Sequence, residues 1–195
     1  MESQKLRFIV NSAVFTAVTA VLAQIEIPLP LVPISGQTLA VGLAATILGS
    51  RQSSAAMIGY ALIGAIGLPV FAGFSGGFQV LAGPTGGYII GFIAAAYITG
   101  LILEKTRFTI PAAFIANTAG MGVTLLFGTV WLKLLLDLNL NQALASGVYP
   151  FLAVGFIKAF LASWIGITVR RRLIQASLLK NNNSKLLDQP LHLLI

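Results

Sequence analysis

The sequence predicts an all-α integral membrane protein with about six transmembrane helices. Of its 195 residues, 57% are hydrophobic and only 9% are charged, whereas soluble domains carry about 25% charged residues. Because a helix needs roughly 20 apolar residues to cross a bilayer, about six helices with short loops use nearly the whole chain. The lysines and arginines also fall in alternate connections, as expected for the cytoplasmic loops of a multi-pass protein.

The apolar segments define the predicted domain organisation. They cover residues 8–27, 36–49, 53–67, 84–103, 110–136 and 148–169. The second and third segments are short for independent spans, so we expect them to tilt or to extend into their flanking loops. In this prediction residues 1–179 form a single six-helix transmembrane domain. Residues 180–195, which include three consecutive asparagines, form a polar, flexible cytoplasmic tail.

The distribution of cations predicts the orientation in the membrane. Connections 28–35, 68–83 and 137–147 contain no lysine or arginine. The other connections and flanks carry Lys5, Arg7, Arg51, Lys105, Arg107 and the cluster Arg170, Arg171 and Arg172. The positive-inside rule then places both termini in the cytoplasm, which needs an even number of spans. A cleavable signal peptide over the first segment is the alternative, but its removal would put the arginine cluster on the wrong side.

The sequence contains no recognisable catalytic or metal-binding motif. It lacks the Gly-x-x-x-x-Gly-Lys-Ser/Thr loop that binds ATP, and none of its lysines follows a glycine. It has no cysteine, one histidine and five carboxylates that are far apart, which argues against metal sites and intramembrane proteases. We therefore expect a protein that is not an enzyme and that has no cofactor, no metal and no nucleic-acid partner.

A lysine inside the sixth apolar segment is the strongest candidate for a binding residue. Lys158 lies about nine residues into that segment, which corresponds to a depth of about 13 Å at the helical rise. A lysine there costs several kcal/mol unless it faces a partner or water. Glu26 and Asp137 lie near the outer ends of their segments, so no acid is expected at a matching depth. The alternatives are snorkelling or an internal partner; we favour a ligand that bears a carboxylate or carbonyl group.

The connection over residues 67–88 has the composition of a buried loop. It is uncharged and rich in glycine, and it carries Phe71, Phe74 and Phe78, whereas an exposed loop would be polar. Irregular apolar backbone is tolerated in a membrane protein where it packs into protein or lines a cavity. Glycines let backbone groups approach a ligand closely. The loop is therefore predicted to be a lid over an outward-facing pocket, and the alternative is a re-entrant structural plug.

Other polar and small residues allow more than one interpretation. Gln37 begins the second segment and is either a pocket residue or an interfacial one. Asn117, Thr118 and Thr124 either line a polar cavity or bond between helices. Ala13 and Ala17 are four residues apart, so they permit close approach of another helix. That helix belongs either to this protein or to a docked partner.

The glycine motifs resemble those of a known family. Gly-Leu-Pro-Val-Phe-Ala-Gly at residues 67–73 and Gly-Pro-Thr-Gly-Gly-Tyr at 83–88 closely resemble BioY, the family of biotin-binding S components of energy-coupling factor transporters in prokaryotes. Pro-Ile-Ser-Gly-Gln-Thr-Leu at 33–39, Pro-Phe at 150–151 and Ile-Lys-Ala at 157–159 match as well. The resemblance runs from the first apolar segment to the sixth.

The resemblance implies a site and partners. BioY-like proteins have six helices with cytoplasmic termini and sit in the prokaryotic cell membrane. They hold biotin, a transported substrate, near the outer face under the first and third connecting loops. Ala13 and Ala17 resemble the face that docks a coupling module of one transmembrane scaffold and two ATPases. By motif position, the substrate-binding residues would be Gln37, Phe71, Gly73, Phe74, Ser75, Gly83, Pro84, Tyr88 and Lys158.

Three positions depart from the family pattern. Gly155 replaces an acidic residue that the family often has three residues before the lysine, Ser75 replaces an asparagine, and Ile89 replaces an arginine found in some members. These changes keep two alternatives open beside biotin uptake. One is an S component for a different small vitamin or precursor, and the other is a membrane scaffold that transports nothing.

Overall fold

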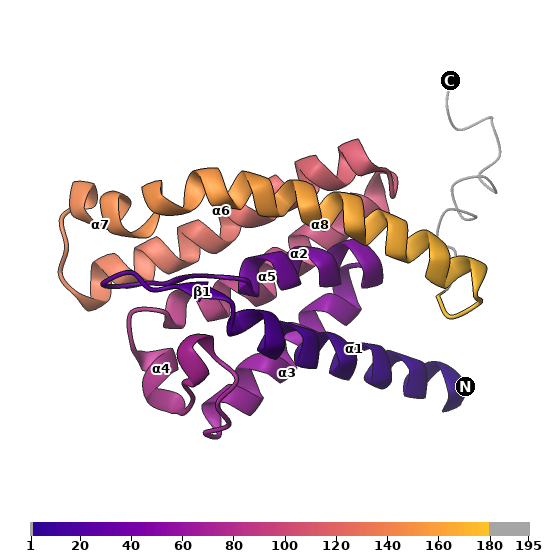
Figure 1. Cartoon of the computed structure of the whole chain (residues 1–195), viewed down its shortest axis with the longest axis horizontal. Helices are drawn as coiled ribbons and strands as arrows, with labels where there is room; N and C mark the ends of the chain where they lie inside the picture. Colours follow the sequence, from indigo (N-terminus) through magenta and orange to yellow (C-terminus); the bar gives the residue numbers. More distant parts are fainter. Residues whose placement is uncertain (1, 180–195) are drawn as a thin grey trace.

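The computed structural model describes residues 2–179, so the predicted tail over residues 180–195 lies outside the described residues. Long helices dominate the described chain (Figure 1). In chain order the elements are α1 (Glu2–Ala23), β1 (Glu26–Ile27), β2 (Ile34–Ser35), α2 (Gln37–Leu48), α3 (Ser50–Ala65), the 3-10 turn η1 (Ala72–Phe74), α4 (Phe78–Ala82), α5 (Gly86–Lys105), α6 (Ile110–Leu135), α7 (Leu140–Gly147) and α8 (Tyr149–Gln175).

The predicted apolar segments correspond to α1, α2, α3, α5, α6 and α8. Within the described residues, α1, α5, α6 and the stretch that combines α7 with α8 are long and apolar enough to cross a membrane. The helices α2 and α3 are shorter, with 12 and 16 residues. The start of α1 and the end of α8 lie at one end of the molecule, and β1, α4 and α7 lie at the other (Figure 1). This arrangement agrees with cytoplasmic termini and with the connections that lack lysine and arginine at the outer end.

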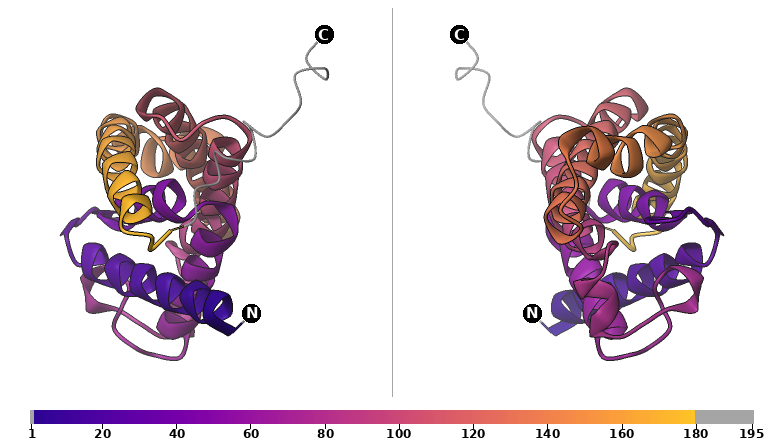
Figure 2. Two further views of the ribbon diagram at one scale, coloured as in Figure 1. Left: turned by 90° about the vertical axis from the view of Figure 1, so that its right-hand side faces the viewer. Right: turned by 90° about the vertical axis from the view of Figure 1, so that its left-hand side faces the viewer.

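The short helix α2 lies in the middle of the bundle. Along the long axis, α1 and α3 lie on one side of it and α6 and α8 on the other (Figure 2). Its buried residues are mostly small, among them Ala40, Gly42, Ala44 and Ala45, so neighbouring backbones can approach closely. A Cβ atom on Gly42 would lie 2.8 Å from Cβ of Ala162 on α8. Because it is surrounded by other helices, α2 does not need the length of a lipid-exposed span.

A tight turn joins α2 to α3 at the end of the molecule that is predicted to be cytoplasmic. Gly49 adopts a φ of 85°, which favours glycine. A carboxylate oxygen of Glu104 accepts a hydrogen bond from the backbone N–H of Ser50 at 2.7 Å and thereby caps α3. The Arg170 guanidinium donates to the carbonyl oxygen of Ile47 and lies 3.6 Å from the centroid of the Phe108 ring. Both charged groups therefore satisfy backbone groups that the turn leaves unpaired.

Arg170 differs from the two arginines that follow it. The sequence places all three in one basic flank after the sixth apolar segment, but the Arg170 side chain is only 4% exposed. Arg171 and Arg172 are exposed. The positive-inside pattern therefore contains one arginine with an internal packing role.

The outer connections contain short elements that the sequence did not predict. Strands β1 and β2 form an antiparallel hairpin in which Glu26 pairs with Ser35. The 3-10 turn η1 and helix α4 interrupt the glycine-rich loop. Helix α7 begins with a capping box, in which Asn139 and Gln142 each accept a hydrogen bond from the other's backbone N–H. The outer end is thus built of ordered elements that cover the ends of the long helices.

Candidate functional site

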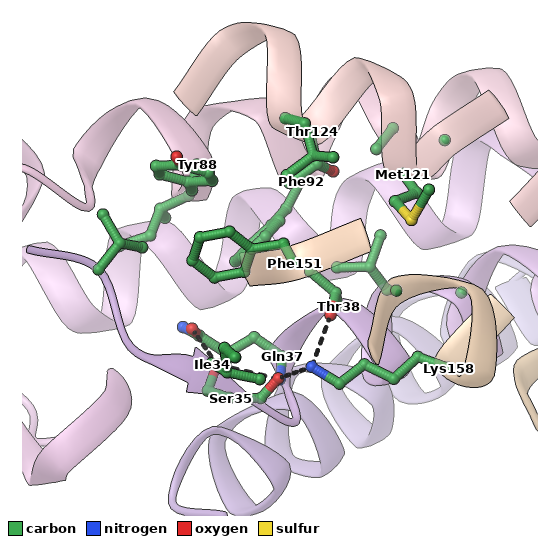
Figure 3. A pocket seen from close by; sticks show the side chains of 18 of the residues that line it. Ile34, Ser35, Gln37, Thr38, Tyr88, Phe92, Met121, Thr124, Phe151 and Lys158 are labelled. Atoms are coloured by element: carbon green, nitrogen blue, oxygen red, sulfur yellow. Dashed lines mark hydrogen bonds between the residues drawn. The ribbon is translucent and has the colours of Figure 1, made fainter. Parts of the chain in front are cut away.

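A cavity lies beneath the hairpin and the glycine-rich loop, among α2, α5, α6 and α8. Its volume is about 190 Å³, compared with the roughly 10–15 Å³ that a single water molecule requires. The walls are largely apolar and aromatic, as is usual for a pocket that binds a small organic molecule. Prominent wall residues are Val32, Phe71, Ile89 and Leu125. Phe92 and Phe151 also belong to the wall (Figure 3).

Lys158 extends from α8 into this cavity. Its ammonium group donates hydrogen bonds to the backbone carbonyl oxygen of Ser35 at 2.6 Å and to Oγ1 of Thr38 at 3.3 Å (Figure 3). The side chain is half-buried and points at the hairpin rather than away from the bundle. Both partners are neutral oxygen atoms, so they orient the ammonium group without balancing its charge.

The charge on Lys158 gives the cavity a preference for anions. Of the described residues that line the cavity, Lys158 is the only one with a charged side chain. An ammonium group has three N–H donors, and two of them are used. A ligand carboxylate would supply both the opposite charge and an acceptor for the third donor.

A row of polar side chains leads from the Lys158 site to the glycine-rich loop. The hydroxyl of Ser35 donates to Oε1 of Gln37 at 2.7 Å, and Nε2 of Gln37 donates to the hydroxyl oxygen of Tyr60 at 2.6 Å. The Tyr60 hydroxyl donates to the carbonyl oxygen of Val70 at 3.0 Å. All three side chains are buried. Because each has a partner, this row fixes the relative positions of the hairpin, α2, α3 and the loop.

Tyr88 anchors the opposite side of the cavity. Its hydroxyl donates to the carbonyl oxygen of Gly147 at 2.8 Å, which connects α5 to the end of α7. Its ring lies 5.9 Å from the ring of Phe151, centroid to centroid. A Cβ atom on Gly128 would lie only 2.3 Å from the Tyr88 ring. Gly128 therefore makes the space that lets the ring reach the cavity wall.

The Phe71 side chain anchors the glycine-rich loop in the hydrophobic core. Its ring is 1% exposed and meets the Tyr60 ring edge to face, with 5.3 Å between centroids and 81° between planes. A Cβ atom on Gly64 would lie 2.0 Å from the Phe71 ring. The ring thus fills a socket that exists because residue 64 has no side chain.

Comparisons with known proteins give consistent matches along most of the chain. The matching family model is that of the BioY family, and it covers residues 1–175. The biotin transporter BioY2 of Lactococcus lactis subsp. cremoris is 39% identical over 173 residues, which are 89% of this chain and 95% of that protein. The biotin transporter BioY of Thermotoga maritima is 37% identical over 166 residues, which are 85% of this chain and 97% of that protein.

The chain belongs to the BioY family. A solved structure agrees: the S-component for biotin from an ECF-type ABC transporter matches with a TM-score of 0.80 and 27% identity, covering 88% of this chain and 94% of that one. The predicted all-α membrane fold and the predicted family are both confirmed. This BioY protein is a multi-pass membrane protein of a transporter family and not an enzyme.

Five of the predicted substrate-binding residues of the BioY protein line the cavity. They are Gln37, Phe71, Ser75, Tyr88 and Lys158. They come from α2, α5, α8 and the glycine-rich loop, so the fold brings together positions up to 121 residues apart in sequence (Gln37 to Lys158). Their contact with a ligand remains a prediction.

The other four predicted residues lie in the loop but outside the cavity lining. Gly73 has a φ of 67° and serves the turn η1, whereas the Phe74 side chain is 72% exposed. The carbonyl oxygen of Gly83 accepts a hydrogen bond from Nε1 of Trp131 at 2.9 Å, and Pro84 follows it directly. These residues shape and fasten the loop, and any direct role in binding also remains a prediction.

The departures from the family pattern lie at the cavity. Gly155, Ser75 and Ile89 all line it. A Cβ atom on Gly155 would lie 2.2 Å from Sδ of Met121, so Met121 occupies the space beside residue 155. This chain therefore has a thioether where the resemblance suggests an acidic side chain.

Some lining residues escaped the sequence analysis or were left undecided by it. Thr38, which orients Lys158, was missed although it directly follows Gln37. Asn117 and Thr124 line the cavity. Asn117 also bonds between helices, since its amide donates to the hydroxyl oxygens of Thr46 and Ser163. Both interpretations of Asn117 therefore hold.

Proposed function

We propose that this BioY protein is the substrate-binding component of a biotin uptake transporter. It captures biotin at the outer face of the membrane and delivers it inward. The observation that carries this proposal is the unbalanced ammonium group of Lys158 in an otherwise neutral, largely apolar cavity at the outer end of the fold. Family membership and the similarity to the S-component for biotin support it.

The chemistry of biotin suits the cavity. Its valerate carboxylate matches Lys158, and its thiophane ring matches the apolar walls. Its ureido group has two N–H donors and one carbonyl acceptor. Along the lining, the oxygen atoms of Ser75, Thr124 and the Asn117 amide can accept from the two donors, and the Thr124 hydroxyl can donate to the carbonyl. A few polar groups in an aromatic cavity are sufficient to orient such a ligand.

The energy for transport has to come from partners. The sequence has no phosphate-binding loop, so the BioY protein does not hydrolyse ATP by that route. The partners we propose are a transmembrane scaffold and two ATPases. Ala13 and Ala17 lie on an exposed face of α1, which supports their proposed role in docking this coupling module.

Biotin binding to the purified protein tests the proposal. A ligand at 100 times its dissociation constant should stabilise the folded protein by about 2.7 kcal/mol. We expect the melting temperature in detergent to rise with biotin and calorimetry to give a stoichiometry close to one. Thiamine, riboflavin and lipoate serve as comparison ligands. Stabilisation by one of these but not by biotin would identify an S component for another vitamin, and no response to any of them would favour the scaffold alternative.

A further inference from the structure

The side chain of Gln24 joins α1 to the glycine-rich loop. Gln24 directly follows the last residue of α1. The two N–H groups of its Nε2 are shared among three carbonyl oxygens, those of Ala20 at 2.9 Å, Phe71 at 3.1 Å and Val70 at 3.3 Å. Its Oε1 accepts a hydrogen bond from the backbone N–H of Phe74 at 2.8 Å. One amide group therefore holds both sides of the turn η1.

The loop segment that Gln24 holds has an unfavourable backbone conformation. Gly73 and Phe74 have φ values of 67° and 53°, so two consecutive residues are left-handed. This region is open to glycine but disfavoured for a residue with a Cβ atom. Moreover, the Phe74 side chain is largely exposed, so its own packing does little to fix it. The hydrogen bond from its N–H to Gln24 supplies an external restraint.

The same amide also positions the cavity wall. Phe71, whose carbonyl Gln24 binds, is one of the loop residues that line the cavity. The carbonyl oxygen of Val70 accepts hydrogen bonds from both Gln24 and Tyr60. Tyr60 is in turn connected through Gln37 and Ser35 to the Lys158 site. The loop is thus held from α1 by Gln24 and from α3 by Tyr60.

We infer that Gln24 is a positioning residue that latches the glycine-rich loop closed over the cavity and thereby sets how long biotin stays bound. The inference rests on the proposed function, since biotin is the probe. Gln24 does not line the cavity, so its effect acts through the loop. Loss of the latch lets Phe71 leave the wall more often, and each such opening gives the ligand a way out.

The test compares two glutamines. Gln24→Met keeps the length of the side chain and removes its hydrogen bonds. Gln79→Met is the matched control. Gln79 lies in the glycine-rich loop itself and donates to the carbonyl oxygen of Gly76, three residues earlier, at 2.8 Å, so it does not join the loop to another element. For Gln24→Met we expect biotin to dissociate roughly tenfold faster with little change in the association rate, since changes within one binding site act mainly on dissociation. Gln79→Met should behave like the unmodified protein.

Hydrogen exchange of the protein without ligand gives a second readout. In Gln24→Met, exchange of the backbone amides of residues 70–78 should accelerate while that of α5 and α6 stays the same. Acceleration throughout the chain, equal effects of the two variants, or unchanged dissociation and exchange in Gln24→Met would each overturn the inference. If Gln24→Met folds poorly, Tyr60→Phe removes one hydroxyl from the same carbonyl of Val70 and must give a smaller change in the same direction. Failure of the unmodified protein to bind biotin would refute the proposed function instead, and the exchange comparison would still test the latch.

Discussion

At the scale of single residues, the site depends on how a lysine is kept inside an apolar bundle. Lys158 gains two hydrogen bonds from neutral oxygen atoms of the hairpin and α2. These bonds compensate part of its desolvation and prevent the side chain from extending toward the membrane surface. Its charge stays unbalanced by any other lining residue of the described chain. Anion binding is therefore favoured by a group that is already in place before the ligand arrives.

Replacement of Lys158 should show how much its ammonium charge contributes to biotin affinity. Lys158→Met keeps the apolar stem and removes the ammonium group. Because a hydrogen bond to a charged group contributes about 1.5–3 kcal/mol, we expect biotin affinity to fall by roughly one to two powers of ten. Biotinamide, which lacks the carboxylate charge, should bind the variant and the unmodified protein with similar affinity. Calorimetry with both ligands measures the difference.

Lys133→Met is the matched control for this experiment. Lys133 is the other lysine within the apolar segments, and it is exposed near the outer end of α6. Its replacement should leave biotin affinity unchanged. If both variants lose affinity equally, or if biotinamide discriminates as strongly as biotin does, the carboxylate does not meet Lys158.

Lys158 could be identified as a candidate site residue from the sequence, because a charge inside an apolar segment has few structural explanations. Gln24 and Tyr60 offered no such signal. A glutamine near a helix end and a tyrosine in an apolar helix are common, and their importance comes from partners 46 and 10 residues away. Met121 beside Gly155 was hidden for the same reason, since only the packing of α6 against α8 brings these two residues together.

At the scale of elements, α3 provides a socket that a side chain of the glycine-rich loop fills. The Phe71 ring fills the space above Gly64, and the Tyr60 ring meets it one helical turn earlier. The hydrophobic segments and the covering loop were readable from composition, because lipid exposure and burial both demand apolar residues. The hairpin, α4 and α7 were not, because two to eight residues carry too little periodicity to predict an element.

A methyl group at residue 64 should disrupt the socket. In Gly64→Ala the new Cβ atom would lie 2.0 Å from the Phe71 ring, so the ring has to leave its socket and Phe71, which lines the cavity, has to shift. Overpacking of this kind typically costs about 1–3 kcal/mol. We expect a lower melting temperature and weaker biotin binding, measured by thermal unfolding with and without biotin.

Gly122→Ala is the matched control for the socket. It lies in α6, and a Cβ atom there would meet nothing within 4 Å. Its melting temperature and its biotin affinity should equal or exceed those of the unmodified protein, because alanine suits a helix better than glycine does. Equal losses in both variants would mean that the helices tolerate no methyl group anywhere, and the socket would have no special role.

At the scale of the whole molecule, the proposed binding cavity and the proposed docking face lie on different surfaces. The cavity lies at the outer end among α2, α5, α6 and α8, whereas Ala13 and Ala17 lie on the exposed face of α1. On the opposite face of α1, Thr16 donates a hydrogen bond to the carbonyl oxygen of Ala56 on α3 at 2.8 Å. The polar face of α1 thus packs internally, and its small-residue face is left for another helix. Ala13 and Ala17 therefore do not serve packing within the described residues, and their docking role stays a prediction.

A bulky residue on this face should therefore uncouple uptake from binding. Ala13→Trp places a large ring where a partner helix has to approach closely. We expect ATP-dependent biotin uptake by vesicles that contain the whole transporter to fall by roughly tenfold. A loss of about 1.4 kcal/mol in the association free energy has this effect. Biotin affinity of the isolated protein should not change, because Ala13 lies outside the cavity lining.

Ile115→Trp is the control for this experiment. Ile115 is 66% exposed on α6, so the variant tests a bulky ring on a face that carries no docking motif. Loss of uptake in Ile115→Trp but not in Ala13→Trp would move the docking surface from α1 to α6, and full uptake without any ATPase would remove the need for a coupling module altogether.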